Sequence, residues 1–248
     1  MRVIAGEYKG RALKPIPGTG TRPTTDRVKE AWASTLGSLL PGGFAGKQVL
    51  DAFAGSGALG IEALSRGAAT CTFFERDRRA FQILSANTAF ITPRETRLAL
   101  RQADITRASR ETAFINRRAA VFDLLILDPP YDLPACDVAA LIQRLLGQEL
   151  LSDTALISYE HRASSADGYA LLQCEPAALA AGAVPAISAL PQLEPLAYKR
   201  YGNSVLEYHG LSNAGRARPQ LQTEGQDHDA CVGSRHLRPC DHRPHRRH

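Results

Sequence analysis

Four consecutive residues, Asp128-Pro129-Pro130-Tyr131, combine a carboxylate, two prolines and an aromatic ring. They follow an apolar run at residues 121–127 whose composition predicts a buried strand. Because proline has no N–H to donate to a sheet, the strand must stop there, at the sheet edge where open α/β sheets bind ligands. We expect these catalytic residues to hold a planar base: Asp128 and the Pro129 carbonyl accept from its exocyclic amine, and Tyr131 stacks on its ring.

A second constellation lies where a predicted strand passes into a predicted helix, at Asp51-Ala52-Phe53-Ala54-Gly55-Ser56-Gly57-Ala58-Leu59-Gly60. Its glycines have the spacing G-x-G-x-x-G, which permits a tight turn and a close approach of the backbone to a ligand. Glu75 follows Gly55 by twenty residues, and its carboxylate suits a ribose diol. These features serve nicotinamide dinucleotides and S-adenosylmethionine alike.

Three carboxylates favour S-adenosylmethionine over a dinucleotide. Asp51, near a strand end, would attract an ammonium group and repel a pyrophosphate. Asp104 follows the third predicted strand and could accept from an adenine amine while Ile105 packs on the ring. Asp128 has no use in a nicotinamide enzyme. The predicted cofactor site, with S-adenosylhomocysteine as product, comprises Asp51, Phe53, Ala54, Gly55, Ser56, Gly57, Gly60, Glu75, Asp104 and Ile105.

Each of these features also has a purely structural interpretation. Asp51 and Asp104 could cap helices, because a carboxylate accepts hydrogen bonds from the first backbone N–H groups of a helix. Glu75 could pair on the surface with one of the arginines that follow it, and residues 128–131 could form a turn. The functional interpretation is favoured because all of them fall at consecutive predicted strand ends.

The scaffold that must position these side chains is predicted by the hydrophobic pattern, which alternates between strand and helix from residue 47 onward. The predicted strands are 48–53, 70–75, 98–103, 121–127 and 155–160, and the predicted helices are 58–66, 77–90, 105–114 and 135–146. This alternation indicates a doubly wound α/β fold with a mainly parallel sheet. Beyond residue 164 the pattern weakens, and late strands are expected at 171–174 and 204–208, as an antiparallel pair.

The first 46 residues are predicted to be a separate basic arm, with a small hairpin, a loop and a helix that ends before Pro41-Gly42-Gly43. Residues 1–47 hold eight Lys and Arg against three Asp and Glu, whereas residues 48–210 hold 15 against 18. A basic arm suits contact with a phosphate backbone, although a small basic excess can also merely be solvated. The predicted division is an RNA-binding arm at 1–46 and a catalytic domain at 47–210.

Composition excludes several classes of protein. The hydrophobic content of 44% and charged content of 22% are ordinary for a soluble globular protein. The N-terminus lacks the apolar run of a signal peptide. The Ala-rich stretch 177–190 is too short to span a membrane and contains Pro185. The five cysteines have no paired spacing, so we expect reduced thiols in a cytoplasmic protein.

Residues 211–248 differ from the rest of the chain. They contain five of the seven His and two of the five Cys, but no Lys and almost no apolar periodicity. We therefore expect a disordered tail. The spacings of Cys231, His236, Cys240 and His242 match no standard zinc finger, so no metal site is predicted.

Residues 51–60 and 128–131 together resemble the class I S-adenosylmethionine-dependent amino-methyltransferases. The arm narrows the resemblance, because its segments 3–6, 9–11 and 22–30 are similar to the RsmD family, as is Tyr201-Gly202-Asn203. Arg22-Pro23-Thr24-Thr25-Asp26-Arg27-Val28-Lys29-Glu30 is the most specific part. The resemblance covers residue 1 to about residue 209 and is poor between 163 and 198.

The resemblance implies a Rossmann-like fold with a seven-stranded, mainly parallel sheet, helices on both faces and an N-terminal hairpin and helix extension. It implies methyl transfer from S-adenosylmethionine to the N2 amine of one guanine in 16S ribosomal RNA, free or in an assembling 30S subunit. We expect a cytoplasmic monomer without membrane contact. The expected phosphate contacts are Lys9, Arg11, Arg22, Arg27 and Lys29.

Alternatives remain open from the residues alone. Arg27 and Lys29 could belong to a solvated helix face. The Asp-Pro-Pro-Tyr motif is shared with adenine-N6 and other amine methyltransferases, including those of DNA, proteins and small molecules, although DNA enzymes normally carry a larger target-recognition region. A different class is a non-catalytic RNA-binding module with a relict cofactor fold. The intact acids Asp51, Glu75 and Asp128 argue against it.

Overall fold

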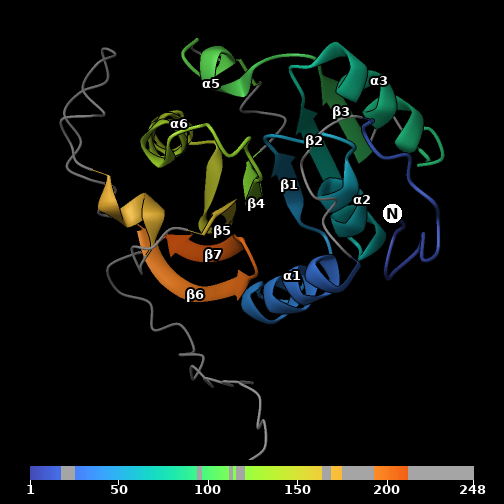
Figure 1. Cartoon of the computed structure of the whole chain (residues 1–248), viewed down its shortest axis with the longest axis horizontal. Helices are drawn as coiled ribbons and strands as arrows, with labels where there is room; N and C mark the ends of the chain where they lie inside the picture. The colour runs from blue at the N-terminus through green and yellow to red at the C-terminus, as the bar shows by residue number, and fades with distance from the viewer. Residues whose placement is uncertain are drawn as a thin grey trace, which may run out of the picture.

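A single seven-stranded sheet organises the part of the chain that the computed structural model describes, which is residues 1–17, 26–93, 97–111, 114–115, 121–163, 169–174 and 193–211 (Figure 1). The strand order is β3-β2-β1-β4-β5-β7-β6. The first five strands pair in parallel, and β7 joins β5 and β6 antiparallel. The expected Rossmann-like, mainly parallel sheet is confirmed.

The strands are β1 Gln48–Asp51, β2 Thr70–Phe74, β3 Leu98–Arg101, β4 Phe122–Leu127, β5 Leu151–Arg162, β6 Leu193–Tyr201 and β7 Ser204–Leu211. The helices are α1 Asp26–Leu39, α2 Ala58–Ser65, α3 Arg78–Asn87, α5 Ile105–Ala108, α6 Ala135–Gly147 and the 3-10 helix η1 Ala170–Gln173. The strand order reverses between β1 and β4, which makes this pair the topological switch point.

Alternation along β4 explains why helices cover both faces of the sheet. Successive strand residues point to opposite faces, so Leu124 and Ile126 join one buried cluster and Leu125 and Leu127 join the other. The first cluster contains residues of α1, α2 and α3, and the second contains residues of α5 and α6 (Figure 1). Among the described residues, no helix is long and apolar enough to cross a membrane.

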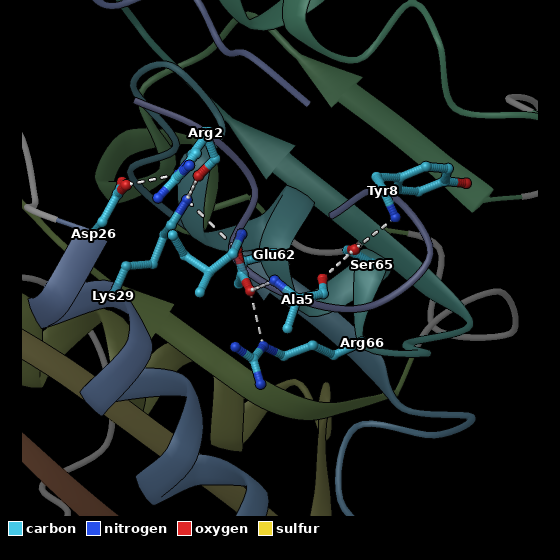
Figure 2. Close-up of polar contacts among 9 residues, drawn as sticks. Arg2, Ala5, Tyr8, Asp26, Lys29, Glu62, Ser65 and Arg66 are labelled. Atoms are coloured by element: carbon cyan, nitrogen blue, oxygen red, sulfur yellow. Dashed lines mark hydrogen bonds and ion pairs between the residues drawn. The ribbon is translucent and has the colours of Figure 1, made fainter. Parts of the chain in front are cut away.

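The N-terminal arm lies against α2 (Figure 2). Its expected hairpin is reduced to one antiparallel bridge, between Arg2 and Ala12. Val3 and Leu13 are buried in the same cluster as the α1 and α2 residues. The arm therefore packs into the core of the sheet domain, and the division of the chain at residue 46 stays a prediction.

The late part of the chain differs from the sequence-based expectation. Residues 171–174 were predicted as a strand, but Ala170–Gln173 form a 3-10 helix, and the partner of β7 is β6 instead. Strand β6 escaped prediction because it lies at the sheet edge with mostly exposed side chains, which removes the apolar alternation. Helix α5 ends at Ala108, short of residue 114. Most of the predicted tail, from residue 212 on, lies outside the described residues.

Candidate active site

A cavity of about 570 Å³ lies beyond the carboxyl ends of β1, β2, β4 and β5. This volume is in the range of small-molecule sites, roughly 300–1,000 Å³. The cavity brings together most of the residues predicted from sequence as the cofactor and base sites. Those lining it are Asp51, Phe53, Ala54, Gly55, Ser56, Glu75, Asp104, Ile105, Asp128, Pro129, Pro130 and Tyr131.

Two predicted cofactor residues, Gly57 and Gly60, do not line the cavity among the described residues. Gly57 is the N-cap residue before α2 and has a φ of 84°, a left-handed conformation that glycine adopts without strain. A Cβ on Gly60 would overlap the Phe73 ring of β2. These glycines therefore shape the loop and allow α2 to approach the sheet, and their contact with a cofactor stays a prediction.

Asp51 ends β1 and is only 1% exposed. Its Oδ2 accepts a hydrogen bond from the Gly60 N–H at 3.1 Å. Burial, with a contribution from the nearby charge of Glu75, raises the pKa of Asp51 to about 7. A cationic group bound beside this carboxyl would relieve that cost, because an adjacent positive charge favours the ionised form. Asp51 therefore has both a structural contact and the electrostatics of an ammonium site.

Glu75 and Asp104 fix the backbone around the cavity. The Glu75 carboxylate accepts from the Gly55 N–H at 2.9 Å and from the Asp77 N–H at 2.7 Å, so it holds the glycine loop. Asp104 caps α5 by accepting from the Thr106 N–H at 2.9 Å. Burial raises the pKa of Asp104, but the hydrogen bonds from Thr106 and the Arg107 N–H, together with the charge of Arg76, lower it overall. The capping alternative is thus confirmed for Asp104, which still lines the cavity.

The motif at residues 128–131 stands at the end of β4, as the prolines predict. Burial and the charges of Glu160 and Asp51 raise the pKa of Asp128 well above its ordinary value. The Tyr131 ring is 40% exposed, with its hydroxyl 2.7 Å from the Ser204 hydroxyl of β7. The Arg162 guanidinium lies over the same ring, 5.3 Å from its centre. The ring is therefore held at its tip and on one face.

Sequence reasoning missed three residues of this site. Glu160 of β5 lines the cavity and is 8% exposed. Its signal was present, because it is a carboxylate at the last position of the predicted strand 155–160. Ser204 holds Tyr131 from the late strand β7. Ile16 of the arm lies over the glycine loop, 3.5 Å from where a Cβ on Gly55 would be. Nothing in the local sequence pairs Ile16 with residues 40 positions later.

Among the expected RNA contacts, Lys9, Arg11 and Arg27 are exposed, and Arg22 lies outside the described residues. Arg11 packs its guanidinium over the Phe90 ring at 4.4 Å. The expectation for Lys29 is wrong, because its side chain is fully buried. Figure 2 shows Lys29 directed at the Arg2 carbonyl, to which it donates a hydrogen bond, and at Glu62, 3.4 Å away. It therefore anchors the arm.

The cavity walls fit S-adenosylmethionine by their chemistry. No Lys or Arg of the described residues forms an ion pair with Asp51, so a buried carboxyl is left for a cationic ligand. Apolar wall is supplied by Phe53, Ile105 and Leu133. In the same described part, no group of three or more His, Cys, Asp or Glu side chains is arranged so that it could hold a metal ion. The individual roles of these residues stay predictions.

Comparison with known proteins gives a consistent family. Residues 1–173 match the family model described as Conserved hypothetical protein 95. The chain is 40% identical over 163 residues to YlbH of Bacillus subtilis, a candidate rRNA methyltransferase, covering 65% of this chain and 82% of YlbH. It is 37% identical over 161 residues to Ribosomal RNA small subunit methyltransferase D of Escherichia coli K12, covering 64% and 74%.

A solved structure of yhhF from Escherichia coli, a candidate methyltransferase, superposes with a TM-score of 0.63 at 28% identity. The superposition covers 85% of this chain and 97% of yhhF. The family match, the relatives and the fold all indicate a methyltransferase, as the glycine loop and the carboxylates around the cavity do. The chain belongs to the RsmD family and is an S-adenosylmethionine-dependent methyltransferase of the class I fold.

Proposed function

We propose that this enzyme transfers a methyl group from S-adenosylmethionine to the N2 amine of a guanine in small-subunit ribosomal RNA. The substrate is 16S RNA or an assembling 30S subunit, and the enzyme acts as a cytoplasmic monomer. One observation carries the proposal: the Asp128–Tyr131 edge opens into the same cavity as the glycine loop. Relatives named as small-subunit rRNA methyltransferases support the choice of RNA.

The cofactor would lie along the carboxyl ends of β1 and β2 and the N-terminus of α5. Asp51 would meet its ammonium group, Glu75 its ribose and Asp104 with Ile105 its adenine. When bound, the cofactor supplies a methyl group already activated by positively charged sulfur. That positive charge favours the ionised forms of Asp51 and Asp128, whose pKa values burial raises in the free protein.

The target guanine must leave its stack to enter the cavity, which costs a few kcal/mol and less in a loop than in a duplex. Tyr131 recovers on the order of 1–3 kcal/mol by stacking on the base. Because Arg162 covers one face of the ring, the base stacks on the other. The hydrogen bond between the Tyr131 and Ser204 hydroxyls keeps the ring from rotating away from the base.

Asp128 and the Pro129 carbonyl accept hydrogen bonds from the two hydrogens of the amine. These contacts hold the nitrogen in line with the methyl group, and this positioning supplies most of the acceleration. Methylation leaves one excess proton on the nitrogen. The Asp128 carboxylate, with its raised pKa, is suited to accept it. The exposed Lys9, Arg11 and Arg27, together with Arg22, contact phosphates of the RNA.

The deciding experiment measures methyl transfer from labelled cofactor to naked 16S RNA, 30S subunits and DNA, followed by identification of the modified base. We expect N2-methylguanine in the RNA or the particle, and none in DNA. Methylated adenine in DNA would instead establish the adenine-N6 alternative. Calorimetry with S-adenosylmethionine separates both from a relict, non-catalytic module, which would bind no cofactor.

A further inference from the structure

Glu160 of β5 lies beside Asp128, the residue that follows the end of β4. Strands β4 and β5 are parallel, and their last registered pair is Leu127 with Tyr159, so Asp128 and Glu160 are each one residue beyond it. In a parallel pair, residues at the same register position point to the same face of the sheet. Both side chains line the cavity, and Glu160 is 8% exposed. Two carboxyl groups therefore stand side by side where the base is expected.

The described surroundings of Glu160 hold its carboxyl group in place but do not supply a Lys or Arg to balance its charge. Burial raises its pKa, and hydrogen bonds with the Ser204 and Tyr131 hydroxyls, together with the charge of His161, offset this only in part. Glu160 in turn raises the pKa of Asp128. Within the described residues, neither acid forms an ion pair with Lys or Arg. Two buried carboxyl groups side by side are costly unless donors satisfy them, so such a pair is suited to a ligand rich in hydrogen-bond donors.

We propose that Glu160 determines base specificity by accepting a hydrogen bond from the N1–H of the target guanine, while Asp128 and the Pro129 carbonyl hold the N2 amine. This inference rests on the proposed function. Guanine presents a ring N–H directly beside its amine, whereas adenine and cytosine present a ring nitrogen acceptor there. In the same pose, those bases would turn a lone pair toward Glu160, so the two acids together select guanine.

The test uses 2-aminopurine, which keeps an amine at the same position but carries an acceptor instead of N1–H. The methylated guanine is mapped in small-subunit RNA, and the RNA is rebuilt with 2-aminopurine at that position. The wild-type protein should prefer guanine in kcat/KM by about 10- to 100-fold, the ratio that one hydrogen bond to a charged group supports. Because 2-aminopurine also lacks O6, the preference of the wild-type protein alone does not isolate the effect of N1–H. The preference for guanine is therefore compared between the wild-type protein and variants at Glu160.

Glu160→Gln is the decisive variant, because its amide can donate to the 2-aminopurine N1. Its preference for guanine should fall at least about tenfold below the wild-type value, which corresponds to one lost charged hydrogen bond. Glu160→Asp gives a second test with a carboxylate that is one methylene too short. Its kcat/KM should fall more for guanine than for 2-aminopurine. Equal losses on both bases, or an unchanged preference, would overturn the proposal.

Matched controls separate specificity from folding. Glu194→Gln makes the same chemical change on an exposed residue of β6 and should keep the wild-type preference. Cofactor affinity from calorimetry reports whether each variant is folded. If the wild-type protein methylates no guanine in small-subunit RNA, the proposed function fails. If it does so and Glu160→Gln keeps the wild-type preference, only the role of Glu160 fails.

Discussion

Two regions of this molecule bury carboxylates, and they do so in opposite ways. Beneath the arm, Glu62 is fully buried and accepts from the backbone N–H groups of Ile4 at 2.8 Å and Ala5 at 3.0 Å (Figure 2). It also pairs with Arg66 at 2.9 Å and Lys29 at 3.4 Å. At the cavity, Asp51 and Asp128 have no such cationic partners among the described residues.

A structural acid and a ligand-binding acid differ in whether the fold itself compensates their burial. Hydrogen bonds and cations around a buried carboxylate compensate its desolvation within the fold, so Glu62 is complete without a ligand. Asp51 and Asp128 have raised pKa values because nothing in the described part of the fold compensates their burial in full. Substitutions in the first region should therefore change stability, and substitutions in the second should change activity.

The largest expected effect is that of Asp128→Ala on methyl transfer. Loss of the amine acceptor should lower kcat/KM by about 10²- to 10⁴-fold, the range for a positioned proton-transfer group. Cofactor affinity should fall far less, because Asp128 is predicted to contact the base and to act on the cofactor only through its charge. Steady-state methylation assays and calorimetry measure the two. Asp153→Ala, at an exposed position of β5, is the control. Full turnover by Asp128→Ala would contradict the mechanism.

Glu62→Ala should act on stability instead. It leaves the Lys29 ammonium buried without its partner, and breaking one side of a buried ion pair costs about 3–5 kcal/mol. Urea denaturation followed by circular dichroism measures the free energy of unfolding. Glu30→Ala, exposed on the same helix as Lys29, should cost less than about 0.5 kcal/mol. A loss below about 1 kcal/mol for Glu62→Ala would remove the distinction between the two regions.

The same comparison shows what the sequence could predict. Strand ends carrying Asp51, Glu75, Asp104 and Asp128 were readable, because apolar runs end at recognisable residues and parallel strands bring their ends to one edge. The burial of Lys29 was not readable from its charge. Its spacing to Trp32 and Leu36 places it on the buried stripe of α1, but its partner Glu62 lies in another helix. Such long-range pairing leaves no local signal.

A pH series should test whether the Asp51 carboxylate binds the ammonium group of the cofactor. Its pKa is raised to about 7 in the free protein, and a bound ammonium group lowers it, so the ionised form binds the cofactor more tightly. Affinity should therefore fall as pH drops through 7, by about tenfold between pH 8 and pH 6. Asp128 faces the same cavity with a raised pKa and adds to this slope.

Calorimetry at pH 6, 7 and 8 measures this effect. Repeating it in buffers of different ionisation enthalpy shows whether protons are released when the cofactor binds. Asp51→Asn should bind more weakly at pH 8 and show a flatter pH profile, because the asparagine side chain does not titrate. A wild-type affinity that does not change over this range would mean that Asp51 does not meet the ammonium group.

The smallest expected effect concerns the exposed cations of the arm. Lys9→Ala with Arg27→Ala should weaken RNA binding by only a few-fold, since each removes one phosphate contact. The slope of log K against log salt should become shallower by about 0.7 for each contact to single-stranded RNA. Lys199→Ala, exposed on β6, is the control. An unchanged slope would remove the arm from the interface and leave it, with Lys29 and Glu62, as a structural element alone.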